Sequence, residues 1–150
     1  MKTSHILINL SEIISCLPRA FVGFQRWIYD LTGGRLLGTI EGCSICVATM
    51  KGAKSGKFYK YPLMYVPYKE GVLLVASRGG APNNPVWYYN LQANPEVEVH
   101  YNGIRKNLIA RRASLKEKAK IWSICVEYYP SYANYQGWCT RDIPVFICLP

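Results

Sequence analysis

Hydrophobic and polar positions change from a helical to a strand-like spacing near residue 34. Residues 6–17 and 21–31 carry apolar side chains at helical spacing, and Pro18 and the pair Gly33-Gly34 interrupt them. The spacing predicts a segment of N-terminal amphipathic helices over residues 1–34. Neither stretch is long enough to span a bilayer, so each is expected either to cover the core or to lie on a membrane surface.

From residue 35 onward the pattern predicts a mainly β domain that ends at residue 150. Six segments rich in β-branched and aromatic residues are bounded by turn signals, at 43–50, 58–68, 72–76, 97–101, 104–113 and 143–149. Asn102-Gly103 is a two-residue hairpin signal, and Ser114 with Glu117 forms a capping box that opens a helix. That helix is expected to bury Ala119, Trp122, Ile124, Cys125 and Val126. Strands with a few short helices favour a small barrel of the α+β class.

The most distinctive segment is 76–95, in which a hydrophobic strand ends in the turn Ser77-Arg78-Gly79-Gly80. A helix is expected to follow, with Asn84 as its cap and Pro85 in its first position. Backbone N–H groups at such a junction, beside an arginine, suit an anion such as phosphate. The alternative is an ordinary strand-loop-helix connection.

The turn 51–57 places three lysines around two glycines between two predicted strands. It lacks the glycine spacing of a P-loop and no helix follows it. Taken alone it favours a solvated hairpin turn, whereas together with Arg78 it indicates a cationic grip on phosphate or carboxylate.

Composition limits the classes of function without choosing one. The 18 basic and 9 acidic residues give a net charge of +9, which implies an anionic partner: nucleic acid, an acidic membrane or an anionic small molecule. The six cysteines show no disulfide framework, so we expect reduced thiols in a cytoplasmic protein. Cys43 and Cys46 have the C-x-x-C spacing but fall on a strand, where they would point to opposite faces.

Catalysis by this chain is expected to depend on a cofactor. His5 and His100 have no carboxylate or thiol partners at a suitable spacing, which argues against metal hydrolysis and against histidine-dependent nucleophilic catalysis. The chemistry would then be the cofactor's, with the protein binding and orienting it.

Four tyrosines near the C-terminus form a second unusual group: Tyr128, Tyr129, Tyr132 and Tyr135. The spacing of the last three places their phenols along one side of a short helix. An aromatic core stripe is the ordinary interpretation, but Pro130 and the polar residues between the tyrosines favour a cleft.

Three motifs together resemble the deazaflavin-dependent nitroreductase family. They are the Ser77 to Gly80 turn with the run 85–95, the C-terminal run 129–136 followed by Trp138, Arg141 and Ile143-Pro144, and the basic turn 52–56. The resemblance covers about residues 35 to 150. It implies a split β-barrel of the flavin-reductase-like kind and an oxidoreductase. The implied reaction passes a hydride from a reduced 8-hydroxy-5-deazaflavin coenzyme to a quinone or a nitroaromatic or nitroimidazole acceptor.

The same resemblance assigns roles to individual positions. Lys54, Ser55 and Arg78 match the phosphate end of the coenzyme, and its ring would be bordered by Pro62, Leu63, Met64, Ala76, Ser77, Val86, Trp87, Asn90 and Tyr132. The acceptor would meet Met64, Ser77, Tyr129, Tyr132 and Tyr135, with Ser77, Tyr129 and Tyr132 catalytic. Family members with tight coenzyme binding often carry arginines where this chain has Ala53 and Tyr59; Lys57 and Lys60 would compensate in charge but not in geometry.

Other interpretations stay open at this stage. Related split barrels bind flavin mononucleotide (FMN) or haem, and a non-catalytic barrel that binds a lipid or an isoprenoid would suit the apolar N-terminal helices. Nucleic-acid binding is the least favoured, because the aromatic residues are not arranged as base-stacking motifs. The expected location is the cytoplasm, with peripheral contact on the inner face of the membrane.

Overall fold

The fold is that of a computed structural model, which describes residues 39–40 and 42–150. The helices expected within residues 1–34 lie outside the described residues. None of the helices in the described part is long and apolar enough to cross a membrane.

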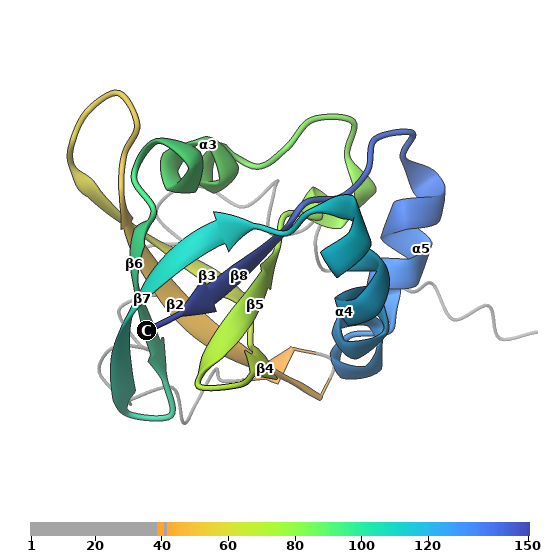
Figure 1. The fold of residues 1–150 in the computed structure, drawn as a ribbon, viewed down its shortest axis with the longest axis horizontal. Helices are drawn as coiled ribbons and strands as arrows, with labels where there is room; N and C mark the ends of the chain where they lie inside the picture. The colour runs from red at the N-terminus through yellow and green to blue at the C-terminus, as the bar shows by residue number, and fades with distance from the viewer. Residues whose placement is uncertain (1–38, 41) are drawn as a thin grey trace, which may run out of the picture.

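Eight strands and three helices follow one another along the described chain (Figure 1). The strands are β1 (Thr39–Ile40), β2 (Cys43–Lys51), β3 (Phe58–Met64), β4 (Val66–Tyr68), β5 (Gly71–Val75), β6 (Glu96–Tyr101), β7 (Ile104–Arg112) and β8 (Val145–Leu149). The helices are α3 (Val86–Ala93), α4 (Leu115–Tyr128) and α5 (Ser131–Trp138), and a short 3-10 turn, η1, spans Arg78–Gly80.

The strands curl into an antiparallel barrel, which confirms the predicted fold class. Their order is β1-β2-β6-β7-β8-β5-β4, and β3, which lies outside this order, also pairs with β2. The sequence pattern predicted one strand over 58–68, but the chain bends at Tyr65, so that β3 pairs with β2 while β4 pairs with β5. The bend closes the barrel, because the segment 58–68 pairs with β2 through β3 and with β5 through β4.

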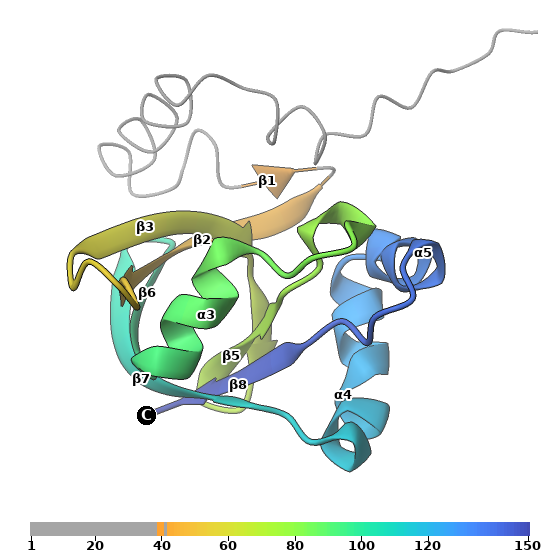
Figure 2. The same cartoon turned by 90° about the horizontal axis from the view of Figure 1, so that it is seen from above.

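Strands β5 and β8 are buried on both faces. Because successive side chains of a strand point to opposite faces, each of these strands contributes to two separate cores. Leu74 and Phe146 point into the barrel, where Trp87 of α3 joins them. Leu73 and Ile147 point outward and pack under α4 and α5. The barrel therefore has an inner core covered by α3 and an outer core covered by the α4–α5 pair (Figure 2).

The hairpin between β6 and β7 and the start of α4 form as predicted. Asn102 and Gly103 adopt φ of 50° and 78° between β6 and β7, the left-handed pair that a tight hairpin requires. Ser114 accepts a hydrogen bond from the Glu117 N–H at 3.2 Å, and the Glu117 carboxylate accepts one from the Ser114 N–H at 2.9 Å. Ala119 is exposed, contrary to prediction, because Ile121 and Cys125 define the face of α4 that packs on the barrel.

The C-x-x-C pair lies on β2 with its thiols on opposite faces, as predicted. Cys46 is buried in the barrel, whereas Cys43 packs against the outer core beside α4 and α5. Burial raises the pKa of the Cys46 thiol to about 12. A thiol held protonated in this way is a core residue and not a nucleophile.

Replacing Phe146 by alanine tests whether the inner core holds the barrel together. Phe146 is 1% exposed, so Phe146→Ala should lower the free energy of unfolding by about 3–5 kcal/mol. Phe58 is 73% exposed, so the matched Phe58→Ala should change it by less than about 0.5 kcal/mol. Urea unfolding measures both, and equal losses would show that the inner core has been placed wrongly.

Candidate functional site

The turn after β5 has the backbone geometry of an anion-binding loop. Ser77 is right-handed helical at φ −74° and ψ −40°, and Arg78, Gly79 and Gly80 are left-handed at φ of 46°, 61° and 78°. A change from right- to left-handed residues directs successive N–H groups into one concavity. Gly80 and Ala81 donate within the turn, to Ser77 and Arg78 carbonyls. Within residues 42–150, the N–H groups of Arg78 and Gly79 make no backbone hydrogen bond.

Gly80 brings this turn into contact with α5. A Cβ on Gly80 would lie 2.9 Å from the Tyr135 carbonyl oxygen and 3.2 Å from the Tyr135 Cα. Only a glycine allows the turn to pack this closely against a helix backbone. The turn that begins at Ser77 is thus held against the helix that carries Tyr135, and both residues are among the predicted acceptor contacts.

The start of α3 differs from the sequence prediction. Asn84 does not cap the helix, because its side-chain oxygen accepts a hydrogen bond from Arg141 Nη1 at 2.7 Å. Pro85 is the cap residue, with φ −65° and ψ 156°, and Val86 is the first helical residue. The connection 81–85 is therefore fixed by a side chain from the far end of the sequence.

Asn90 fixes the basic hairpin 51–57 beside α3. Its side chain is 5% exposed; Oδ1 accepts from the Ala53 N–H at 3.0 Å and Nδ2 donates to the Tyr61 hydroxyl at 3.2 Å. Ser55 Oγ lies 2.9 Å from the Tyr59 hydroxyl, which orders the tip of the same hairpin. In Figures 1 and 2 the hairpin, α3 and η1 follow one another along one end of the barrel.

The cations of the predicted phosphate end lie on these two loops. Lys54 and Lys57 are exposed on the hairpin, and Arg78 is exposed on the turn. Exposed cations and a concavity of N–H groups form a donor set that fits phosphate and carboxylate oxygens. The residues present thus fit the anionic part of a deazaflavin coenzyme.

The predicted ring-bordering residues do not all share one surface. Pro62, Leu63 and Met64 alternate along β3, so Leu63 packs against the inner core and Met64 against the outer core, while Pro62 is exposed. Ala76 and Trp87 are buried in the inner core, and the Trp87 ring lies 5.9 Å from that of Phe146. Val86 is 69% exposed at the start of α3. Trp87 therefore has a packing role, and only the small exposed part of its side chain would be available to the coenzyme ring.

Three of the four tyrosines are buried in the outer core. Tyr129, Tyr132 and Tyr135 are 5%, 3% and 4% exposed, and the hydroxyls of Tyr129 and Tyr135 lie 3.1 Å apart. The cleft location favoured by the sequence is not what the structure shows, because the intervening Ala133 and Asn134 face outward while the phenols turn inward. Burial holds the pKa of Tyr132 well above its ordinary value, so its phenolate form is less accessible than that of an exposed tyrosine.

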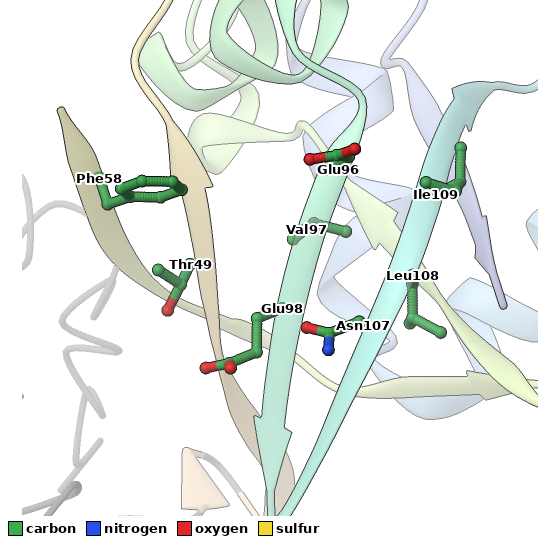
Figure 3. Close-up of a pocket in the computed structure, with 8 residues that line it drawn as sticks. All are labelled: Thr49, Phe58, Glu96, Val97, Glu98, Asn107, Leu108 and Ile109. Atoms are coloured by element: carbon green, nitrogen blue, oxygen red, sulfur yellow. The ribbon is translucent and has the colours of Figure 1, made fainter. Parts of the chain in front are cut away.

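A hollow on the barrel wall lies away from these loops. An open depression of about 440 Å³ lies over β2, β6 and β7, where Thr49, Glu98 and Asn107 stand side by side (Figure 3). Glu96 adds a second carboxylate to its lining, and no lysine or arginine lines it. Its charge does not suit the anion that the basic loops favour.

Arg141 is the site residue whose role sequence reasoning missed. The sequence indicates Arg141 only as part of the C-terminal motif, because no local pattern shows that its side chain contacts residues 76–84. Its contacts with that segment form the most connected polar group at this end of the barrel.

Comparisons with known proteins confirm the predicted family. A family model described as F420H(2)-dependent quinone reductase matches residues 22–150. The chain is 36% identical over 125 residues to the F420H(2)-dependent quinone reductase Rv1261c of Mycobacterium tuberculosis, covering 80% of this chain and 83% of that protein. It is 37% identical over 100 residues to the putative F420H(2)-dependent quinone reductase Rv3178 of the same species, covering 67% of this chain and 84% of that protein.

A solved structure gives the same result. The structure described as an F420-H2 dependent reductase has 43% sequence identity and a TM-score of 0.64, and the match covers 69% of this chain and 92% of that one.

Gly80 and Gly103 provide a matched test of the contact between the turn and α5. Both have φ of 78°, so alanine pays a similar backbone cost of about 1 kcal/mol at either position. At Gly103 the new Cβ meets nothing within 4 Å, whereas at Gly80 it meets the Tyr135 backbone. Gly80→Ala should therefore lower the unfolding free energy by clearly more than Gly103→Ala in urea titrations. Equal losses would mean that the turn does not pack on α5 as described.

Proposed function

Because the chain belongs to the F420H(2)-dependent quinone reductase family, we propose that it transfers a hydride from the reduced deazaflavin coenzyme to a quinone bound beside the η1 turn. The chain is an oxidoreductase of this family, and its coenzyme is the F420 deazaflavin. The observation that carries the proposal is the alignment of the basic hairpin, α3 and η1 along one end of the barrel.

The anionic end of the coenzyme would be held by both loops. Arg78 and the N–H groups of the η1 turn are suited to a phosphate, and Lys54 and Ser55 on the hairpin are suited to further anionic groups. Asn90 is a positioning residue here, since its hydrogen bond to the Ala53 N–H keeps the hairpin against α3. These contacts orient the bound molecule and do not themselves take part in the chemistry.

The reacting end would lie between the turn and α5. When bound, the reduced deazaflavin supplies the hydride, so the protein needs to exclude water and to hold the acceptor nearby. Ser77 is partly exposed at the start of the turn and can donate a hydrogen bond to a developing oxyanion. The tyrosines are packed as a fixed floor. Burial raises the pKa of Tyr132, so its hydroxyl would act as a hydrogen-bond donor and not as a phenolate.

The acceptor we favour is a quinone, with nitroaromatic and nitroimidazole compounds as further acceptors of the same planar, electron-poor kind. Peripheral contact with an acidic membrane, in which quinones dissolve, is supported by the exposed Val86 and Tyr89 on α3, by Trp138 on α5 and by the exposed cations of the loops.

Anaerobic mixing of the purified protein with reduced deazaflavin and a naphthoquinone tests the function. We expect the absorbance of the oxidised coenzyme to appear at a rate that depends on both the protein and the quinone, and nitrofurans tested in parallel would define the acceptor range. Absence of protein-dependent oxidation would contradict the proposal. A flavin spectrum of the purified protein, or co-purified lipid, would then identify an FMN-binding or lipid-binding barrel.

The Tyr132 hydroxyl should matter more for turnover than for coenzyme binding. Tyr132→Phe removes the buried hydroxyl but keeps the ring, so we expect kcat to fall about tenfold or more while the Kd of the coenzyme changes less than about twofold. Tyr129→Phe, which breaks the pair with Tyr135, should act in the same direction. The control Tyr128→Phe alters an exposed tyrosine and should leave kcat unchanged. Unchanged turnover in both buried variants would remove the tyrosines from the mechanism.

Ala53→Arg should strengthen coenzyme binding. The Ala53 side chain is exposed on the basic hairpin, and the substitution keeps the backbone hydrogen bond to Asn90. A charge-assisted contact with an anionic group is worth about 1.5–3 kcal/mol, so the Kd should fall about tenfold or more and the gain should shrink at high salt. Ala119→Arg on the exposed side of α4 is the matched control. If both arginines act alike, net charge alone controls binding and the hairpin is not part of the site.

A further inference from the structure

Arg141 connects the segment before β8 to the whole connection between β5 and α3. Its Nη2 donates to the Ser77 carbonyl at 2.7 Å and its Nε to the Ala81 carbonyl at 2.9 Å. Its Nη1 donates to Asn84 Oδ1 at 2.7 Å and to the Ala76 carbonyl at 3.2 Å. One guanidinium thus bonds to both sides of the η1 turn.

The backbone around Arg141 is also held by hydrogen bonds. The Arg141 carbonyl accepts from Gln136 Nε2 at 2.8 Å, and Gln136 Oε1 accepts from the Ile143 N–H at 2.9 Å and from Lys118 Nζ at 3.0 Å. Lys118 is buried on α4 and also pairs with Asp142. The backbone that carries the guanidinium is therefore tied to both α4 and α5.

The turn needs an external restraint of this kind. Arg78, Gly79 and Gly80 are successively left-handed, and this conformation is strained at an arginine because its Cβ crowds the following carbonyl oxygen. Two glycines add the largest loss of backbone entropy on ordering. The internal bonds from Gly80 and Ala81 span only the turn itself and do not fix it to the barrel.

We propose that Arg141 is a positioning residue for the deazaflavin site: it holds the η1 turn so that Arg78 and the N–H groups of the turn face the anionic end of the coenzyme. Arg141 makes its contacts through carbonyls and Asn84, so it acts through the turn and not on the reacting atoms. The inference rests on the proposed function, because that function names the ligand of the turn.

Arg141→Lys tests the role with the charge retained. A lysine has one ammonium on a flexible stem and cannot reach carbonyls on both sides of the turn with a planar fork. Arg105→Lys is the matched control, since Arg105 lies on β7 and pairs with Glu98 on the exposed barrel wall. Both full-length variants are compared with wild type at a temperature at which thermal unfolding curves show all three to be folded.

Amide hydrogen exchange without ligand gives a readout independent of activity. In Arg141→Lys, exchange at Gly80 and Ala81 should rise about tenfold or more, while exchange in β2 and β6 stays at the wild-type level. Fluorescence titration with the oxidised deazaflavin should show a Kd raised about tenfold, and Arg105→Lys should match wild type in both measurements. Wild-type exchange or wild-type affinity in Arg141→Lys would overturn the proposal.

A double-mutant cycle with Asn84→Ala distinguishes a joint role of Arg141 and Asn84 from independent losses of stability. If both residues act through the bond between Nη1 and Oδ1, the double variant should bind the coenzyme no more weakly than Arg141→Lys alone. Additive losses of coenzyme affinity would contradict a joint role of the two residues. If wild type itself binds no deazaflavin, the proposed function and the ligand assigned to the turn both fail, whereas the exchange data still decide whether Arg141 holds the turn.

Discussion

The pairing of β5 with β8 is the constraint from which the site follows. These antiparallel strands are in register from Val72 with Cys148 to Val75 with Val145, so the chain leaving β5 and the chain entering β8 meet at the same edge of the barrel. The last bond of this ladder runs from the Ala76 N–H to the Pro144 carbonyl at 2.9 Å. The η1 turn and Arg141, which are far apart in sequence, become neighbours for this reason.

The two halves of the site are held in different ways. The turn is fixed between the barrel and α5 by the guanidinium of Arg141 and by the close approach of Gly80 to Tyr135. The basic hairpin is tied to α3 through the buried side chain of Asn90. Rigid placement of the turn suits a group that must meet an acceptor in one geometry, and exposed lysines on a longer loop suit attraction of a charged ligand.

Short-range signals predicted the parts of the structure that depend on short-range physics. The Asn102-Gly103 hairpin and the Ser114 capping box each rely on neighbouring backbone groups, and the strands follow the alternation of apolar side chains. Asn84 was assigned as a cap because the local pattern could not show that Arg141 competes for its oxygen. The polar residues between the tyrosines suggested a cleft, but the outer core beneath α4 and α5 takes the phenols inward. Both errors arise from contacts between residues distant in sequence.

We propose that the coenzyme binds across the basic hairpin, α3 and the η1 turn, and hydrogen-exchange mapping of the full-length protein with and without the oxidised deazaflavin tests that placement most directly. We expect saturation to slow exchange in residues 52–57 and 78–81 and to leave exchange at Glu98, Asn107 and Ile109 on the barrel wall unchanged. Slowed exchange around the depression of Figure 3, with none at the two loops, would contradict it.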